Sequence, residues 1–166
     1  MLRWLFFATL SVILFLQLRG LDESLRAEAP GGIVGYELAW SAPRANEFIS
    51  AWRASDILET AKVSLGVDFA FLLAYPLMFA AGAALLVRRP IAGSFDRFGD
   101  GIRRAVLLCI PLDSAENLAL WRMIDNGASD GLAHLATICA VLKFTLVAAA
   151  TIWCLVALGR LRGQRG

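Results

Sequence analysis

The sequence predicts an all-α membrane protein, a bundle of four transmembrane helices with a short amphipathic helix on the outer surface between spans one and two. The composition and four long apolar stretches support this fold class. Of the 166 residues, 58% are hydrophobic and 18% are charged, whereas about 25% are charged in soluble domains. The mean hydropathy is +0.65. These values exclude a disordered chain, a nucleic-acid-binding protein and an ordinary soluble enzyme, and residues 1–166 suit one integral membrane domain.

The four apolar stretches are long enough to cross a bilayer. A hydrocarbon core about 30 Å thick requires about 20 mostly apolar residues per helix, because lipid offers no hydrogen-bond partner to exposed backbone groups. The expected spans are residues 2–18, 63–87, 105–124 and 132–158.

The first span has an alternative interpretation as a cleaved signal peptide. Arg3 precedes the apolar run, and Ala27-Glu28-Ala29 fits a small-x-small cleavage pattern. The residues between the run and this pattern include Asp22 and Glu23, which is a charged composition for a cleavage region. We therefore interpret residues 2–18 as a retained span, with cleavage as the alternative.

Arginine placement predicts that both termini are cytoplasmic, since cytoplasmic loops are rich in Lys and Arg. The side of the termini carries Arg3, Arg88, Arg89, Arg97, Arg103, Arg104, Arg160, Arg162 and Arg165. The opposite side carries Arg19, Arg26, Arg44, Arg53 and Arg122. That side also holds most of the loop acids, namely Asp22, Glu23, Glu28, Glu37, Glu47, Asp125 and Asp130.

Residues 30–54 are too polar to span the bilayer but are patterned as a helix on the outer surface. Ser41 can cap this helix, and Pro43 suits its first turn. Its apolar stripe is Ala45, Phe48, Ile49 and Trp52. The helix is interpreted as a simple interfacial connector or as a gating lid over the bundle.

Two further features flank this helix. Tyr36, Trp40 and Trp52 are aromatic residues of the kind found at headgroup level. Asp56, with Glu59 three residues later, predicts a capped start of the second span.

Six polar residues lie inside the predicted spans: Asp68 and Tyr75 in the second, Asp113, Glu116 and Asn117 in the third, and Lys143 in the fourth. Each ionised group facing lipid would cost about 2.5–3.5 kcal/mol. The acids and the amide of the third span share one helical face, and small residues surround the lysine. We therefore expect spans two to four to converge on a polar interior, with the lysine between Glu116 and Asp68 and able to reach either.

This polar interior allows three functions. One lysine cannot neutralise three carboxylates, so we expect that one acid is protonated or that water enters. The first possible function is therefore a proton relay or a binding site for a small polar or cationic ligand. The alternative is a structural or partner-binding module whose network only fixes helix packing. A membrane enzyme using Asp113 and Glu116 as acid and base on a lipid-soluble substrate would need an apolar cavity beside them, open sideways to the bilayer. No nucleophile or phosphate loop accompanies them.

Neither a metal nor a cofactor is expected. Cys109, Cys139 and Cys154 lie inside spans without a C-x-x-C pair, which argues against thiol–disulfide exchange. His134 has no neighbouring ligand residue and is expected to form interfacial hydrogen bonds. The lipid bilayer is the one partner that the sequence indicates, and the oligomeric state is left open.

Four segments in conserved order resemble an uncharacterised family of small four-span bacterial inner-membrane proteins. They are GIVGYELAW from Gly32, ANEFISAW, SLGVDFAFLLAY from Ser64 and LDSAENLAL from Leu112. The most telling marks are Asp68-Phe69 with Tyr75, and Leu112-Asp113 with Glu116-Asn117. The resemblance covers most of the chain and implies a four-span topology in a bacterial inner membrane, without implying a substrate.

Overall fold

The computed structural model describes residues 1–87 and 94–163, and within these ranges the regular structure is helical. The elements, in chain order, are α1 (Leu2–Glu28), α2 (Gly32–Glu37), α3 (Ala42–Ala54), α4 (Leu58–Val87), α5 (Ser94–Ala105), the 3-10 turn η1 (Val106–Leu108), α6 (Cys109–Asn126) and α7 (Asp130–Gly163). Arg88, Arg89 and Arg165, which the sequence assigns to the side of the termini, lie outside the described residues.

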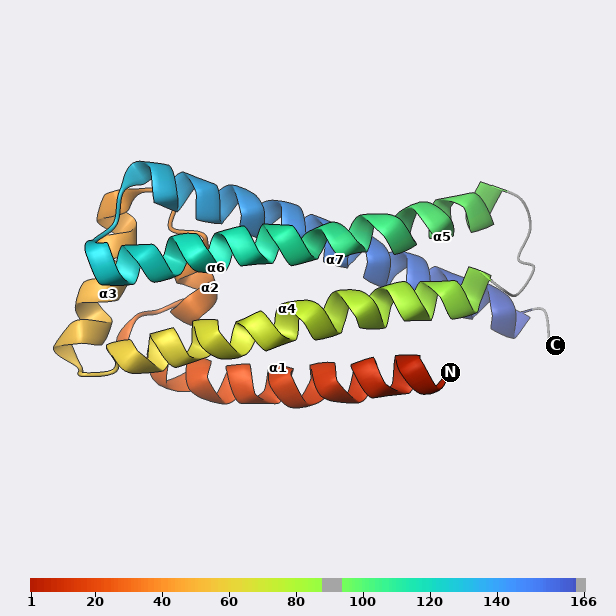
Figure 1. Ribbon diagram of the computed structural model, residues 1–166, viewed down its shortest axis with the longest axis horizontal. Coiled ribbons are helices and arrows are strands. Elements are labelled where there is room, and N and C mark those ends of the chain that lie inside the picture. The colour runs from red at the N-terminus through yellow and green to blue at the C-terminus, as the bar shows by residue number, and fades with distance from the viewer. Residues whose placement is uncertain (88–93, 164–166) are drawn as a thin grey trace.

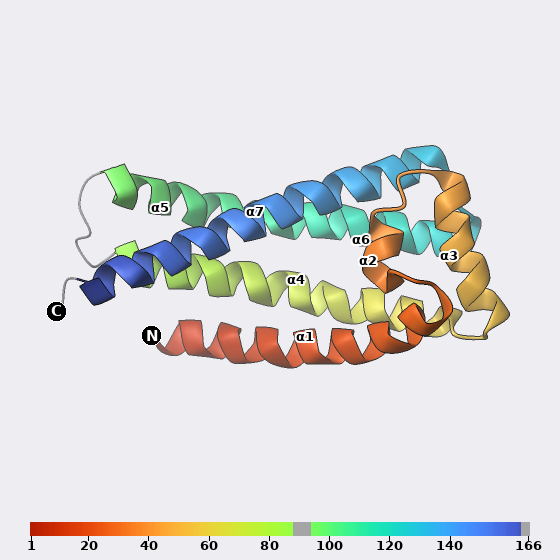
Figure 2. The ribbon, with the colours of Figure 1, turned by 180° about the vertical axis from the view of Figure 1, so that it is seen from behind.

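The long helices run side by side along one axis (Figure 1). Helix α1 packs against α4, α4 also packs against α6, and α6 packs against α7. Helices α5 and α6 follow one another through η1 as one long rod (Figure 1). Short helices α2 and α3 lie across one end of the bundle, and the start of α1 and the end of α7 lie at the opposite end (Figure 2).

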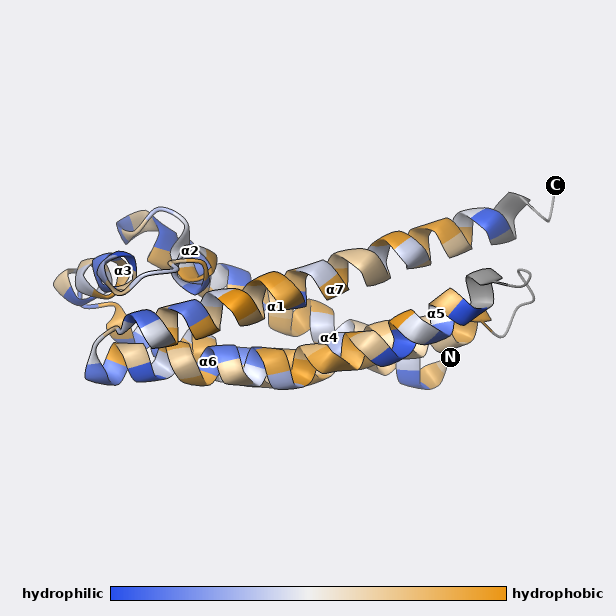
Figure 3. Ribbon diagram, turned by 90° about the horizontal axis from the view of Figure 1, so that it is seen from above, coloured by the Kyte–Doolittle hydropathy of each residue, from blue (hydrophilic) through white to orange (hydrophobic). Residues whose placement is uncertain are grey.

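Within the described ranges, three helices are long and apolar enough to cross a membrane: Leu2–Glu28, Leu58–Val87 and the Asp130–Arg160 part of α7. Figure 3 shows apolar residues along the middle of α7 and hydrophilic residues toward the two ends of the bundle. The predicted third span, 105–124, falls on the end of α5, on η1 and on α6, and it is not among the three. Asp113 and Glu116 lower the mean hydropathy of this segment, so its composition alone does not identify it as a fourth membrane span.

The helix ends differ from the predicted span ends. Helix α1 continues to Glu28 rather than ending at residue 18, and α4 begins at Leu58 rather than at residue 63. The added turns are polar but remain helical, because their inner faces still have apolar neighbours: Leu25 is fully buried. A span predicted from hydropathy ends where the apolar sequence ends, whereas a helix continues until its backbone N–H and C=O groups no longer find hydrogen-bond partners within it.

Two predicted caps also differ in detail. Asp56 has φ 57° and lies in the turn before α4, so it does not cap that helix. Ser41 does precede α3, and Pro43 lies in the first turn, but the Ser41 hydroxyl accepts no capping hydrogen bond. Instead, Oδ1 of Asp130 accepts a hydrogen bond from the Ala42 N–H at 2.7 Å, which ties the start of α3 to the start of α7.

The predicted apolar face of α3 is confirmed, because Ala45, Phe48, Ile49 and Trp52 are all buried. This face packs on a core at that end of the bundle, formed with residues of α1, α2, α4 and α6. A second apolar core occupies the other end and includes Leu72, Val106 and Trp153. The polar residues of the predicted site lie between the two cores.

Tyr36 and Trp52 do not present their rings to lipid headgroups, contrary to the expectation from their sequence positions. Both side chains are fully buried. The Tyr36 hydroxyl donates to the Leu120 carbonyl at 3.0 Å, and Trp52 Nε1 donates to the Leu25 carbonyl at 3.0 Å. Their polar atoms thus have protein partners, and only Trp40 of the three aromatic residues is exposed.

Candidate functional site

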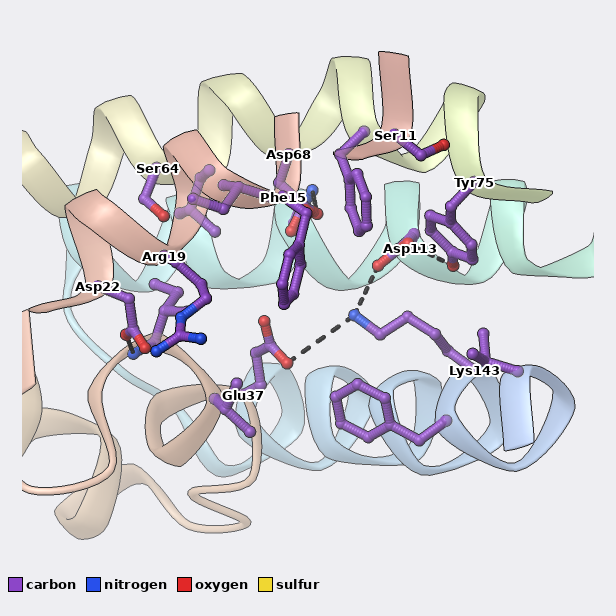
Figure 4. Close-up of a pocket in the computed structure, with 18 of the residues that line it drawn as sticks. Ser11, Phe15, Arg19, Asp22, Glu37, Ser64, Asp68, Tyr75, Asp113 and Lys143 are labelled. Carbon is purple, nitrogen blue, oxygen red and sulfur yellow. Dashed lines mark hydrogen bonds and ion pairs between the residues drawn. The ribbon is translucent and has the colours of Figure 1, made fainter. Parts of the chain in front are cut away.

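Lys143 of α7 is the centre of a buried polar cluster (Figure 4). Its Nζ lies 2.6 Å from Asp113 Oδ1, 3.0 Å from Glu116 Oε1 and 3.8 Å from Glu37 Oε2. Only 7% of the Lys143 surface is exposed, and both α6 acids are almost completely buried. The structure therefore joins one ammonium to three carboxylates on two other helices.

The local sequence explains why α6 and α7 come this close. Asp113 and Glu116 are three residues apart and point from one face of α6. The facing side of α7 is made of small buried residues, Ala136, Cys139 and Ala140. Small side chains let two helices approach closely, so that the long lysine side chain extends between them.

The other three predicted residues complete the cluster from α4 and α6. The Tyr75 hydroxyl donates to Asp113 Oδ2 at 2.8 Å, and Asn117 Nδ2 donates to Asp68 Oδ2 at 2.7 Å. The six predicted residues therefore lie around one polar region. The sequence predicted that Lys143 could reach either Asp68 or Glu116, and in the structure it contacts Glu116. Asp68 instead accepts a hydrogen bond from the Asn117 amide.

Glu37 is the member of the cluster that the sequence did not identify. The sequence placed it among the acids of an outer loop, whereas the structure buries it at the end of α2 with 8% of its surface exposed. The hydroxyl of Thr137 on α7 donates to the Glu37 carbonyl at 3.0 Å and accepts from the Trp40 N–H at 3.1 Å. These bonds hold the end of α2 against α7. A useful signal was available: Glu37 is the single charged residue in the otherwise apolar run GIVGYELAW.

The buried position of Glu37 changes its proton affinity. Burial raises the pKa of this carboxyl to about 7, and the attraction of the Lys143 ammonium opposes that rise. Glu37 therefore exchanges its proton near neutral pH, where an ordinary surface glutamate is fully ionised.

A cavity of about 660 Å³ opens beside the cluster (Figure 4). It lies between the α1–α4 pair and the α6–α7 pair, with α2 closing one end. Its polar wall beside the cluster is formed by Glu37, Asp68, Asp113, Asn117 and Lys143, and Arg19, Asp22, Glu23 and Arg26 line the end toward α2. Glu116 does not line the cavity. Its contact in the cluster is with Lys143, which does.

Several buried oxygen atoms of the cluster have no hydrogen-bond donor. Glu37 Oε2 and Asn117 Oδ1 are buried and accept no hydrogen bond from any described residue. Glu116 Oε2 is also without one, although it lies 3.0 Å from Lys143 Nζ. Counting Asp68 with the three acids around Lys143 gives four carboxyl groups for one ammonium, a charge of −3 if all were ionised. Such a charge is too costly in a low-dielectric interior to stand without protons, water or a cationic ligand.

The remaining predicted residues show no second site. In the part of the chain that the structure describes, no group of three His, Cys, Asp or Glu side chains has the arrangement of a metal site. The three cysteines are free, with Cys109 and Cys139 buried. The His134 ring lies 4.5 Å, centroid to centroid, from that of Trp40.

No protein-family model, no curated protein and no solved structure matches the chain. The resemblance to a family of small four-span bacterial proteins therefore stays a prediction. What the protein does has to be inferred from the cluster and the cavity beside it.

Proposed function

We propose that the protein is a four-span protein of the bacterial inner membrane that binds a small cationic ligand in the cavity and exchanges protons with the bulk solution as it does so. The observation that carries this proposal is the excess of carboxylates over ammonium groups in the cluster, where Asp68 faces the cavity without a salt bridge to any described residue. A ligand ammonium supplies both the donors and the positive charge that the cluster lacks.

The arrangement of the helices supports the four-span topology. The rod formed by α5, η1 and α6 runs alongside α4 and α7 (Figure 1). The acids of α6 face Lys143 rather than lipid, so they do not prevent a crossing. The start of α1 and the end of α7 lie at one end of the bundle (Figure 2), as an even number of crossings requires. Arginines at that end favour the cytoplasm by the positive-inside rule.

Proton exchange follows from the same excess of carboxylates. Burial raises the pKa of Glu37 to about 7, so a small change in its surroundings changes its proton occupancy near neutral pH. A cation that enters the cavity stabilises the ionised form of the nearby acids, and protons leave as it binds. This coupling distinguishes a functional site from a network that only fixes helix register.

The enzyme alternative has support from the cavity but one feature against it. The cavity reaches Asp113, as an acid–base mechanism on a lipid-soluble substrate requires. However, Asp113 and Glu116 share the same lysine, and Glu116 is not on the cavity wall. A pair of differently tuned groups that both reach a substrate is therefore not available from these two residues.

The test uses n-octylammonium as the probe and the full chain in detergent micelles. Calorimetric titration should show saturable binding, with protons released into a weakly buffered solution. Asp68→Asn keeps an acceptor for the Asn117 amide but removes the charge, so binding should weaken about tenfold or more. Glu47→Gln on the exposed face of α3 is the matched control and should leave the affinity unchanged. If the wild type shows no saturable binding, or if Asp68→Asn binds equally well, the proposed function is wrong.

A further inference from the structure

The cavity has an apolar opening along the side of the bundle, between α1 and α7. Val12 and Phe15 of α1 and Phe144 of α7 line it and are also 56%, 50% and 40% exposed, respectively. Both helices are long and apolar enough to cross a membrane, and α1 packs against α4 rather than against α7. A molecule dissolved in the hydrocarbon can therefore reach the carboxylates without passing through water.

The end of the cavity near α2 holds two arginines beside the acids Asp22 and Glu23. Arg19 and Arg26 of α1 both line it. The Arg26 guanidinium is held by Asp22, whose other oxygen accepts the Ile33 N–H at 2.8 Å. Arg19 is exposed and forms no hydrogen bond or ion pair with the residues that the structure describes. Figure 4 shows its guanidinium between Asp22 and Glu37.

Unpartnered polar atoms point to a ligand in the space between these charges. Glu37 and Asn117 each have a buried oxygen without a hydrogen-bond donor, as stated above. The Ser11 hydroxyl of α1 is also buried and without a partner, and it lies on the cavity wall. These atoms come from α1, α2 and α6, which is the arrangement of a binding site rather than of one helix surface.

We propose that the ligand is an aminophospholipid of the outer leaflet, which enters sideways between α1 and α7. Its primary ammonium lies among Glu37, Asp68 and Asn117. Its phosphate lies at Arg19, and its acyl chains leave over Val12, Phe15 and Phe144. This inference rests on the proposed function, because the ammonium occupies the site proposed there.

Several physical features agree with this ligand class. Arginine binds phosphate oxygens through two parallel N–H groups, and Arg19 follows directly on the apolar run 2–18, at the depth where headgroups begin. The cavity volume of about 660 Å³ is within the range of about 300–1,000 Å³ typical of ligand sites. A lipid with an anionic head alone would meet the excess of carboxylates, and a quaternary ammonium offers them no N–H donor.

The experiment compares soluble short-chain lipids on the full-length protein in detergent. Dioctanoyl phosphatidylethanolamine, phosphatidylcholine and phosphatidylglycerol are titrated separately, and bound lipid is counted by native mass spectrometry. The ethanolamine lipid should bind about tenfold more tightly than the other two. Arg19→Gln should weaken its binding about tenfold, because a hydrogen-bonded charge is lost, but should not weaken n-octylammonium binding, because this probe has no phosphate and the lost charge is positive. Asp68→Asn should weaken both ligands.

Arg53→Gln on α3 is the matched control, since Arg53 is exposed and does not line the cavity. If the three lipids bind equally, or if Arg19→Gln has no effect while n-octylammonium still binds, the ligand is a simple cation and the lipid assignment is wrong. If n-octylammonium binding is absent as well, the proposed function itself fails.

Discussion

Lys143 is the one cation in the described part of the chain that contacts Glu37, Asp113 and Glu116. The three contacts are unequal: Asp113 and Glu116 are at hydrogen-bond distance, whereas Glu37 is at 3.8 Å. The two α6 acids therefore hold the lysine in place. Glu37 faces the cavity and is the carboxyl group free to respond to a ligand or to pH.

The pH dependence of stability provides a test of the Glu37 environment. Its pKa is raised to about 7 in the folded protein, so the folded state binds more protons than the unfolded state between about pH 4.5 and pH 7. The contribution of Glu37 to the free energy of unfolding is therefore most favourable below pH 4.5, and it is lost as the pH rises from about 4.5 to about 7. Glu37→Gln mimics the protonated form and should remove this part of the pH dependence.

The measurement is the midpoint of thermal unfolding in detergent at pH 5 and pH 7.5. Glu37→Gln should raise the unfolding midpoint above that of the wild type, and this increase should be larger at pH 7.5 than at pH 5. Glu47→Gln serves as the control, because that carboxylate is exposed on α3. An equal difference between Glu37→Gln and wild type at both pH values would show that Glu37 is ionised throughout.

At the scale of the elements, α2 positions the site although it has only six residues. Its first residue, Gly32, has φ 57°, and a Cβ at that position would lie 2.1 Å from Asp22 Oδ1. The helix begins there because glycine tolerates this conformation, and because Asp22 accepts the next backbone N–H. The geometry that brings Glu37 to Lys143 therefore depends on a glycine five residues earlier.

Gly32→Ala should both destabilise the protein and weaken ligand binding. The positive φ and the clash with Asp22 together should cost about 1–3 kcal/mol of the free energy of unfolding. A shifted α2 would also move Glu37 away from the cavity. Unfolding and n-octylammonium titration in detergent measure the two effects. Gly66→Ala in α4 is the control, since a Cβ there meets nothing within 4 Å, and it should leave both properties unchanged or raise stability. Unchanged binding in Gly32→Ala would mean that α2 does not position the site.

How far the sequence predicts these elements depends on the range of the interactions. The apolar stripe of α3 and the shared face of Asp113, Glu116 and Asn117 follow from helical periodicity, which is local, and both are confirmed. The burial of Tyr36 and the contact of Glu37 with Lys143 depend on α2 folding back between α1 and α7. Those contacts join residues about a hundred positions apart, such as Glu37 and Thr137. Local periodicity carries no information about them.

At the scale of the whole molecule, two apolar cores lie on either side of a polar middle. The cores hold the helices in register at both ends of the bundle. The polar middle can then keep unpartnered acceptors beside an open cavity, because the two apolar cores, and not the ion pairs of the cluster, hold the helices together. A buried ion pair contributes little net stability compared with apolar side chains, so this division leaves the cluster available for a ligand.

The crossing of the membrane by α5, η1 and α6 is the feature of the whole molecule most open to a direct test. Arg97 in α5 and Asn126 at the end of α6 are exposed and flank this rod. Single cysteines at these two positions can be probed with a membrane-impermeant maleimide on bacterial cells that express the protein, with the wild type as background for the native cysteines. Asn126→Cys should react on intact cells, and Arg97→Cys should react only after permeabilisation, because four crossings place the two residues on opposite sides. Labelling of both, or of neither, on intact cells would place them on one side. The rod would then not cross, and the acids of α6 would lie in a bundle with three membrane spans.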